Sequence, residues 1–526
     1  MKQGFEGKNI ATLVKANAIV FISSFCVMVI ELIAPRILAP YIGVSLYTWT
    51  SIIGIVLASI AVGNFLGGKI ADKYTSHTVL ATILLAGALA TIGILPVTKI
   101  VTSGDWFGNM SPMMNFTLKS CCIFFVPALI LSMVSPMAIK LTLTDLKQTG
   151  GIVGTMYAIS TAGAILGTFM TGFYFILWFG LRMIVWLVFG ILVLTGILAW
   201  FSWKTPGRWR FSRQNLLLWT VAGAVLLTSF LLYGSRDRWQ ETYTRESNYY
   251  AIQIRTTWGN VKTLFLDNFM HAFVIPDEPT TLLFPHLKAY AEIVRYFNPE
   301  GHTFKTLHLG GGGYSFPRYL EAVYPDSLNE VVEIDPAVTE IAYEELGLPR
   351  DTKIKSYNVD ARQYLLQHAT GNRYDFIVSD CFNEYSTPYH LTTLEYDRLV
   401  KASMEEDGIY IVNIMDNYEH GRYMASVIRT LKEVFNNVYL IRTRPFWEHF
   451  RLATYIVLAS DRPLDLTDWR KTVSDDLIKR ADVTPHDDKK LDEYLVWRDA
   501  ILLTDDFAPT DIMLMQVRYP QSDERE

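Results

Sequence analysis

The first 233 residues contain seven apolar runs, each long enough to cross a lipid bilayer as a helix. A hydrocarbon core of about 30 Å needs roughly 20 apolar residues of helix. One such run could be a buried helix of a soluble protein, but seven in succession, joined by short polar links, predict a helical membrane bundle. The runs lie near residues 16–34, 51–68, 78–97, 116–138, 152–178, 183–202 and 215–233.

Small residues and one acidic residue distinguish these runs. Gly63 and Gly67 have the four-residue spacing that lets two helices approach closely in lipid, and the fifth run is also rich in glycine. Pro127 and Pro136 predict a kink in the fourth run. Glu31 lies inside the first run, where a carboxylate exposed to lipid is costly. It either has a function in the membrane, pairs with Arg36, or lies near the membrane interface.

Composition excludes several classes of protein. Of the 526 residues, 50% are hydrophobic and only 19% are charged, and the net charge of −5 argues against a nucleic-acid partner. No metal-ligand spacing occurs among Cys and His residues, so no metal is expected. The first apolar run is too long for a cleavable signal peptide. The four cysteines are expected to be buried thiols rather than a disulfide framework: Cys26, Cys121, Cys122 and Cys381.

The distribution of Lys and Arg bears on which side of the membrane the chain ends. With seven helices and a cytoplasmic N-terminus, the outside links hold only Arg36, Lys99 and Arg182, a clear positive-inside pattern. An odd number of crossings would place the rest of the chain outside. We expect the second half in the cytoplasm nonetheless, with one run, or the stretch 35–49, only partly inserted.

The second half has the pattern of a soluble α/β domain. From about residue 234 charges become frequent, and short β-type runs alternate with helical segments, which predicts a parallel, doubly wound sheet. We therefore divide the chain into a transmembrane domain, 1–233, and a nucleotide-binding domain, 234–526. The second comprises a small β-hairpin region, 240–275, a Rossmann-like core, 300–460, and a C-terminal extension, 461–526. The core strands are expected at 303–309, 329–335, 353–360, 374–380, 408–415, 437–441 and 454–460.

A glycine-rich loop follows the first core strand. Four glycines, Gly310, Gly311, Gly312 and Gly313, stand between that strand and a helical segment, and such a loop lets a ligand approach the backbone. The next strand ends about 20 residues later in Glu333 and Asp335, where an acidic side chain can accept hydrogen bonds from ribose hydroxyls. Asp335 precedes Pro336 and could instead cap a helix, so Glu333 is the stronger ribose candidate.

Two further strands end in aspartates. Ligands of open α/β sheets bind at the carboxyl ends of the strands. Asp360, followed by Ala361, is expected at the adenine edge, and Asp380 is expected to face the reacting centre unless it only begins a turn.

These motifs resemble those of the spermidine/spermine synthase (polyamine aminopropyltransferase) family. The resemblance rests on ESNYYAIQI, LFLDNFMHAF, LHLGGGGYSFPRYL, VVEIDP, VDARQYL and YDFIVSDCF in this order. In the first half, VIELIAPRILAPYIGVSLYTWTSIIG, FLGGKIADK and YAISTAGAILGTFMTGF resemble the bacterial membrane-fused branch, in which a transporter-like domain precedes the synthase domain. The implied fold of the second half is Rossmann-like, of the class I S-adenosylmethionine-methyltransferase type.

The resemblance implies transfer of an aminopropyl group from decarboxylated S-adenosylmethionine to a polyamine such as putrescine. The glycine loop, Glu333, Asp335, Asp360 and Ala361 would then hold the adenosyl compound, and Asp380 would be the catalytic base. Candidates for the acceptor site, with His390 also the alternative base, are Tyr250, His271, Asn383, Tyr389 and His390.

The chain departs from the family pattern where that family binds amines. The loop aspartate is replaced by Gly313, the second carboxylate of the Asp-x-x-Asp pair by Asn383, and the glutamate of a Tyr-x-Glu motif by His286. Each replacement removes about 1.5–3 kcal/mol of charged hydrogen bonding. Ordinary putrescine chemistry is therefore open to question.

Three functions remain. The first is a membrane-bound aminopropyltransferase; the second is another transferase using S-adenosylmethionine on the same scaffold; the third is a non-catalytic domain that senses adenosyl compounds, including 5′-methylthioadenosine, or polyamines for a transporter-like bundle. The expected location is a bacterial inner membrane, with the lipid bilayer as partner. The sequence leaves open whether the protein forms a homodimer.

Overall fold

The computed structural model describes the chain in segments and divides it into two compact units. The units are Met1–Arg238 and Trp239–Glu526. The described residues are 2–42, 46–103, 106–107, 110, 112–143, 149–202, 241–257, 259–267, 269–298, 301–368, 373–382, 387–442, 452–473, 482–483 and 488–518.

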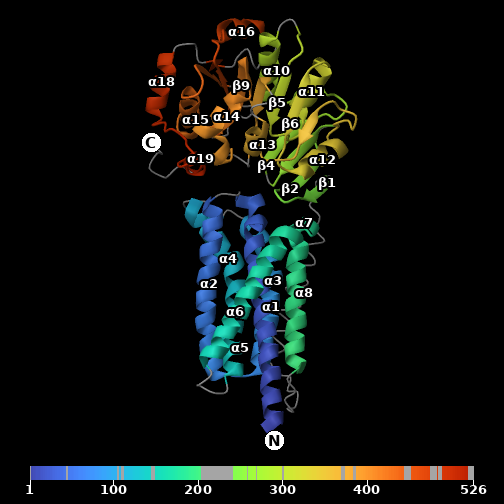
Figure 1. The fold of residues 1–526 in the computed structure, drawn as a ribbon, viewed down its shortest axis with the longest axis vertical. Helices are drawn as coiled ribbons and strands as arrows, with labels where there is room; N and C mark the ends of the chain where they lie inside the picture. The colour runs from blue at the N-terminus through green and yellow to red at the C-terminus, as the bar shows by residue number, and fades with distance from the viewer. Residues whose placement is uncertain are drawn as a thin grey trace. The chain divides into compact units, whose positions relative to one another are not determined.

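The first unit is helical (Figure 1). Its elements are α1 (Lys2–Ile42), α2 (Leu46–Lys73), α3 (His77–Ser103), α4 (Pro112–Ser132), α5 (Val134–Thr142), α6 (Thr149–Met170), the π-helical turn η2 (Thr171–Phe175), α7 (Ile176–Trp178) and α8 (Leu181–Ser202). Six stretches of the described part are long and apolar enough to cross a membrane, and they correspond to the first six predicted runs. The seventh predicted run, 215–233, lies outside the described residues.

Glycines set the helix pairs of this bundle. A Cβ at Gly63 would collide with the carbonyl of Leu129, and one at Gly67 would lie 2.7 Å from the Cα of Met133, so α2 and α4 touch backbone to backbone. Gly163 of α6 meets α1 in the same way. This is the close approach that small residues permit. The fourth run breaks at Met133, because proline at 136 clashes with the preceding turn.

The second unit begins with a small antiparallel sheet. Its four strands are β1 (Glu241–Glu246), β2 (Ala251–Thr256), β3 (Lys262–Leu266) and β4 (Phe269–Val274), in that order. Ile252, Ile254 and Leu264 alternate along one face and are fully buried. They pack against Val338 and Ile341 of α12 (Pro336–Glu344), so two hydrophobic faces close on each other.

The main sheet has eight strands in the order β12-β10-β11-β9-β8-β5-β6-β7. The strands are β5 (Lys305–Leu309), β6 (Leu328–Val332), β7 (Lys355–Tyr357), β8 (Tyr374–Ser379), β9 (Met404–Asp416), β10 (Asn437–Arg442), β11 (Ala453–Ser460) and β12 (Asp482–Val483). The five strands from β7 to β9 are parallel, as predicted, and the order is that of the methyltransferase-type Rossmann-like fold.

The expectation of an all-parallel sheet was wrong at one end. β11 runs antiparallel to both β9 and β10, and β12 runs antiparallel to β10, so the sheet is mixed. The segment 443–452 that joins β10 to β11 is shorter than the dozen or so residues that a parallel crossover needs.

Helices cover both faces of this sheet (Figure 1). One face packs against α13 (Ala361–His368), α14 (Leu394–Ala402), α15 (Tyr423–Lys432), α18 (Asp488–Trp497) and α19 (Thr510–Arg518). The other packs against α10 (Pro285–Phe297), α11 (Ser315–Val323) and α16 (Leu466–Thr472). The carboxyl ends of β5, β6 and β8 therefore meet at one edge between these layers, as ligand sites of open sheets do.

Candidate functional site

The glycine loop turns directly off the end of β5. Gly310 has a φ of +96°, which favours glycine, and a Cβ there would collide with the backbone carbonyl of Asp380. At Gly313 a Cβ would lie 2.5 Å from the Cβ of Ala272 on β4. The loop thus passes between the end of β8 and the small sheet with no room for side chains at these two positions.

Glu333 holds the loop in shape from the end of β6. One carboxylate oxygen, Oε2, accepts hydrogen bonds from the backbone N–H groups of Gly311 (2.9 Å) and Gly312 (3.2 Å), and Oε1 accepts from that of Asp335 (2.9 Å). Burial raises the pKa of the Glu333 carboxyl, and these three donors oppose that rise. The predicted ribose ligand is therefore adjacent to the loop and organises it.

Asp335 is a helix cap. Its Oδ1 accepts from the N–H of Ala337 at 2.9 Å at the start of α12, and its Oδ2 accepts from the hydroxyl of Ser247 at 2.5 Å. The carboxylate is thereby engaged on both oxygens, which agrees with the capping alternative drawn from Pro336.

Asp380 follows the last residue of β8 and carries the only acidic side chain among the described residues that line the pocket beside the loop. Its Oδ1 accepts a hydrogen bond from Nδ2 of Asn413 on β9 at 2.8 Å, and its Oδ2 lies 3.9 Å from Nε2 of His286. About 30% of the side chain is exposed, so one face of the carboxylate is open to a substrate.

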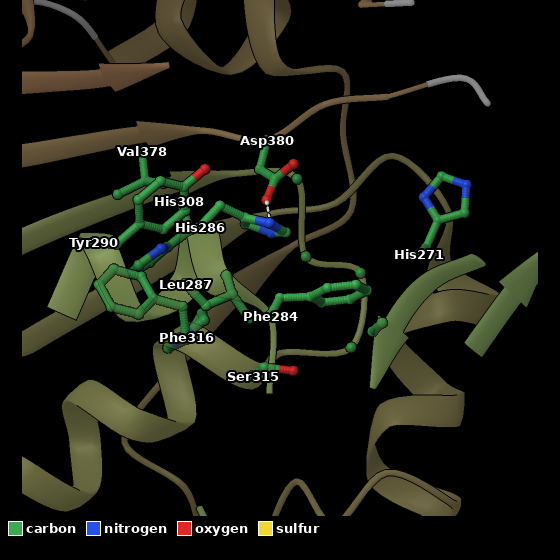
Figure 2. Close-up of a pocket in the computed structure, with 16 residues that line it drawn as sticks. His271, Phe284, His286, Leu287, Tyr290, His308, Ser315, Phe316, Val378 and Asp380 are labelled. Atoms are coloured by element: carbon green, nitrogen blue, oxygen red, sulfur yellow. Dashed lines mark ion pairs between the residues drawn. The ribbon is translucent and has the colours of Figure 1, made fainter. Parts of the chain in front are cut away.

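The pocket lies between the glycine loop, β4 and the start of α10. Figure 2 shows His286 directly below Asp380, with His308 and Tyr290 beside it and His271 beyond the ring of Phe284. Its lining comprises His271, Ala272, Phe284, His286, Leu287, Tyr290, His308, Gly310, Gly311, Gly312, Gly313, Ser315, Phe316, Pro317, Val378 and Asp380.

The sequence analysis named His286 only as the replacement of a glutamate, and it missed Tyr290 and His308 of the lining and Asn413 beside Asp380. His286 and Tyr290 are one helical turn apart on α10, and their rings contact edge to face at 5.7 Å. His308 of β5 and Asn413 of β9 are polar residues inside otherwise apolar strands. A buried polar residue in such a strand is a signal, since it has to be satisfied by a partner.

Asp360 lies outside this pocket lining and is paired. Its Oδ1 accepts from the backbone N–H groups of Arg362 and Gln363, and its Oδ2 lies 2.9 Å from Nε2 of His390. Burial acts to raise the Asp360 pKa, but the bonds to His390 and the backbone outweigh it and lower the pKa. Arg362 in turn forms an ion pair with Asp505. The structure therefore brings two predicted residues, Asp360 and His390, to each other.

The other predicted residues are dispersed. Tyr250 is partly buried, with its ring 6.4 Å from that of His271, which lines the pocket. Ala361 is buried as the first residue of α13, and Tyr389 is 56% exposed. Asn383 lies outside the described residues.

Part of the second unit is similar to a known family of domains. Residues 310–451 match the family model of the spermine/spermidine synthase domain. Residues 310–451, which begin at the glycine loop, are therefore similar to a spermidine synthase domain, and the preceding apolar helices are consistent with a membrane-fused form.

Individual relatives match over parts of their length. A polyamine aminopropyltransferase of Vibrio vulnificus is 34% identical over 128 residues, 24% of this chain and 42% of the relative. The human eEF1A lysine and N-terminal methyltransferase is 28% identical over 146 residues, 26% of this chain and 21% of the relative. The chain thus spans less than half the length of these relatives. The crystal structure of a probable spermidine synthase from Corynebacterium glutamicum has a TM-score of 0.44 at 23% identity, over 49% of this chain and 95% of that one.

Proposed function

We propose that the second half of this protein transfers an alkyl group from an adenosyl sulfonium compound to an amine, with aminopropyl transfer from decarboxylated S-adenosylmethionine as the primary reaction. The observation that carries the proposal is the position of Asp380. Its carboxylate stands at the end of β8 beside the glycine loop, and one face is open to the pocket. The family match and the aminopropyltransferase relatives support the same reaction class.

The donor would bind along the loop. Glu333 lies next to the backbone of Gly311 and Gly312, where it can exchange a loop hydrogen bond for one from a ribose hydroxyl. Asp360, at the following strand end, could bind the adenine amino group if His390 moves from its Oδ2. No metal is required in this scheme, because the sulfonium is itself the leaving group.

The chemistry needs one base. Free amines are protonated near pH 7, so the acceptor nitrogen has to lose a proton before or during attack. Its lone pair forms a bond to the carbon beside the sulfonium, and the carbon–sulfur bond breaks with its electron pair passing to sulfur, which leaves a neutral thioether. Asp380 takes the proton. Asn413 holds one oxygen of that carboxylate, so the other faces the substrate.

The bundle would tether this reaction to a membrane. Six described helices are long and apolar enough to cross one, and we place the second half in the cytoplasm of a bacterial cell, where adenosyl donors are made. With a cytoplasmic N-terminus, this placement requires an even number of full crossings.

A second candidate is methyl transfer from intact S-adenosylmethionine, which the 28% identity to a methyltransferase favours. Product formation by the purified full-length protein, assayed by mass spectrometry with each donor and a panel of amines, separates the two. Alkylated amine and 5′-methylthioadenosine are expected with the decarboxylated donor. Methylated amine with the intact donor alone would establish the second candidate, and no product with either would favour a sensing domain.

A further inference from the structure

The pocket beside the loop is poor in charge. Among the described residues that line it, Asp380 is the only acidic one, and no Lys or Arg is present. The carboxylate of Glu333 lies behind the loop, where it is hydrogen-bonded to Gly311 and Gly312. From the described lining, a ligand in the pocket therefore meets one negative charge.

The three histidines of the pocket add no positive charge to it at pH 7. Burial lowers the pKa of His271 to about 4 and that of His308 to about 3. Burial also lowers the pKa of His286, although the nearby Asp380 carboxylate acts in the opposite direction. All three imidazoles are neutral at pH 7. Burial and the same carboxylate raise the pKa of Tyr290, which keeps its hydroxyl neutral.

The walls around Asp380 are aromatic. Phe284 stacks on His286 with ring centroids 5.0 Å apart at 26°, and Tyr290 contacts Phe316 at 5.4 Å. Figure 2 shows these rings below and beside the carboxylate. A linear diamine would place its attacking nitrogen beside Asp380. Its second ammonium would then contact neutral aromatic rings. Burying a charge without a partner costs several kcal/mol.

Some neutral hydrogen-bonding groups of the pocket have no partner in the described part of the chain. Among the described residues, the hydroxyl of Tyr290, the hydroxyl of Ser315 and Nε2 of His271 are buried and have no hydrogen-bond partner. All three residues line the pocket. A buried polar atom without a partner is costly, so a ligand that supplies one is favoured. Neutral hydroxyl, ether or amide groups match these atoms.

We infer that the acceptor is a monoamine: one basic nitrogen attacks from beside Asp380, and the remainder is neutral and carries a hydrogen-bonding group. This inference rests on the proposed transfer function and names its acceptor class. A second carboxylate cannot be accommodated at Gly313, because the Cβ of Ala272 blocks that position. Among the described residues, the neutral side chain of His286, 3.9 Å from Asp380, is therefore the one we assign as the determinant of acceptor charge.

Three four-carbon amines test the inference with the full-length protein. They are putrescine, butylamine and 4-amino-1-butanol, which share the attacking amine and differ only in the distal group. We expect kcat/KM to be highest for 4-amino-1-butanol and at least about 10-fold lower for putrescine, the range of one charged hydrogen bond. Each acceptor is assayed with the decarboxylated and the intact donor.

A matched pair of variants tests the role of His286 in selecting the acceptor charge. His286→Glu puts a second carboxylate beside Asp380, where the two repel unless a second ammonium binds. The ratio of kcat/KM for putrescine over butylamine should rise by about 10-fold or more, whereas the neutral control His286→Gln should leave the ratio near that of the wild type.

The outcomes separate the two proposals. Wild-type preference for putrescine would overturn the monoamine inference, since the aromatic rings would then hold the second ammonium through cation–π contacts, and it would leave the transfer function standing. Absence of product with all three amines and both donors would overturn the proposed function itself. The wild-type series decides the inference even if a variant does not fold.

Discussion

Nε2 of His286 lies 3.9 Å from Oδ2 of Asp380, at the junction between the first turn of α10 and the end of β8. The imidazole approaches Oδ2, whereas Asn413 donates a hydrogen bond to Oδ1 at 2.8 Å. Both neighbours are neutral, so Asp380 keeps its negative charge available for an incoming ammonium. The first prediction concerns this carboxylate.

Asp380→Asn should lower turnover by roughly 10²–10⁴, the usual contribution of a general base. The amide keeps the shape but cannot take the proton. The fold should tolerate this substitution. Oδ1 of Asn413 has no partner among the described residues, so it can accept a hydrogen bond from the new amide once the Asn413 side chain flips. Turnover is measured with saturating donor and amine.

Donor affinity is the control for that variant, and it should change much less than turnover. Near wild-type turnover in Asp380→Asn would move the base elsewhere, with His390 the next candidate.

Glu333 should bind the ribose of the donor. For the wild type, 5′-methylthioadenosine should bind about 10- to 150-fold more tightly than its 2′-deoxy analogue, the range of one charged hydrogen bond. In Glu333→Gln that ratio should shrink, since the amide lacks the charge. Calorimetry gives both constants.

This comparison of two ligands isolates the ribose contact from the loop. Glu333 also accepts from Gly311 and Gly312, so its replacement can weaken both ligands together. An unchanged ratio in Glu333→Gln would refute the ribose assignment and leave Glu333 a purely structural residue.

Gly313→Ala should destabilise the second unit by about 1–3 kcal/mol, as overpacking does. The new methyl would lie 2.5 Å from the Cβ of Ala272, so the loop or β4 has to move. Ala272→Gly in the same chain should restore most of the loss. Thermal unfolding of the single and double variants measures this, and a single variant as stable as the wild type would contradict the contact.

His271 should make stability fall in acid. Its pKa is about 4 in the folded chain, against an ordinary value of 6.5, because burial disfavours the charged form. Between these values the unfolded chain binds a proton that the folded chain does not, so the unfolding free energy decreases as pH falls. The full effect of one such histidine is roughly 3 kcal/mol.

His271→Gln removes this titration. Denaturant unfolding between pH 4 and 7 should show a shallower pH dependence in the variant than in the wild type. Parallel curves would mean that the pKa of His271 is the same in the folded and unfolded chains.

The second half should face the cytoplasm. A single cysteine placed at position 522 in a cysteine-free background should resist an impermeant maleimide in intact cells and react after lysis. Labelling in intact cells would instead place the domain outside and require an odd number of crossings.

The sequence determined the elements and their order. Apolar runs of about 20 residues can satisfy their backbone polar groups in lipid only as helices, which is why six predicted runs correspond to six candidate spans. In the second half, alternation of strands and helices predicted the parallel part of the sheet. The sequence also predicted the positions of the glycine loop and Asp380, since each directly follows the end of a strand.

Tertiary structure alone decided what surrounds Asp380. His286 comes from α10 and Asn413 from β9, and their positions depend on how these elements pack rather than on local pattern. From the sequence, Gly313 was interpreted as the replacement of a carboxylate. The fold shows that Ala272 of a separate sheet occupies the space that a side chain at 313 would need. The direction of β11 likewise depended on its partner strands. Side-chain spacing along the chain is local, but burial, charge and steric exclusion at a site arise from contacts between distant segments, and these exist only once the chain has folded.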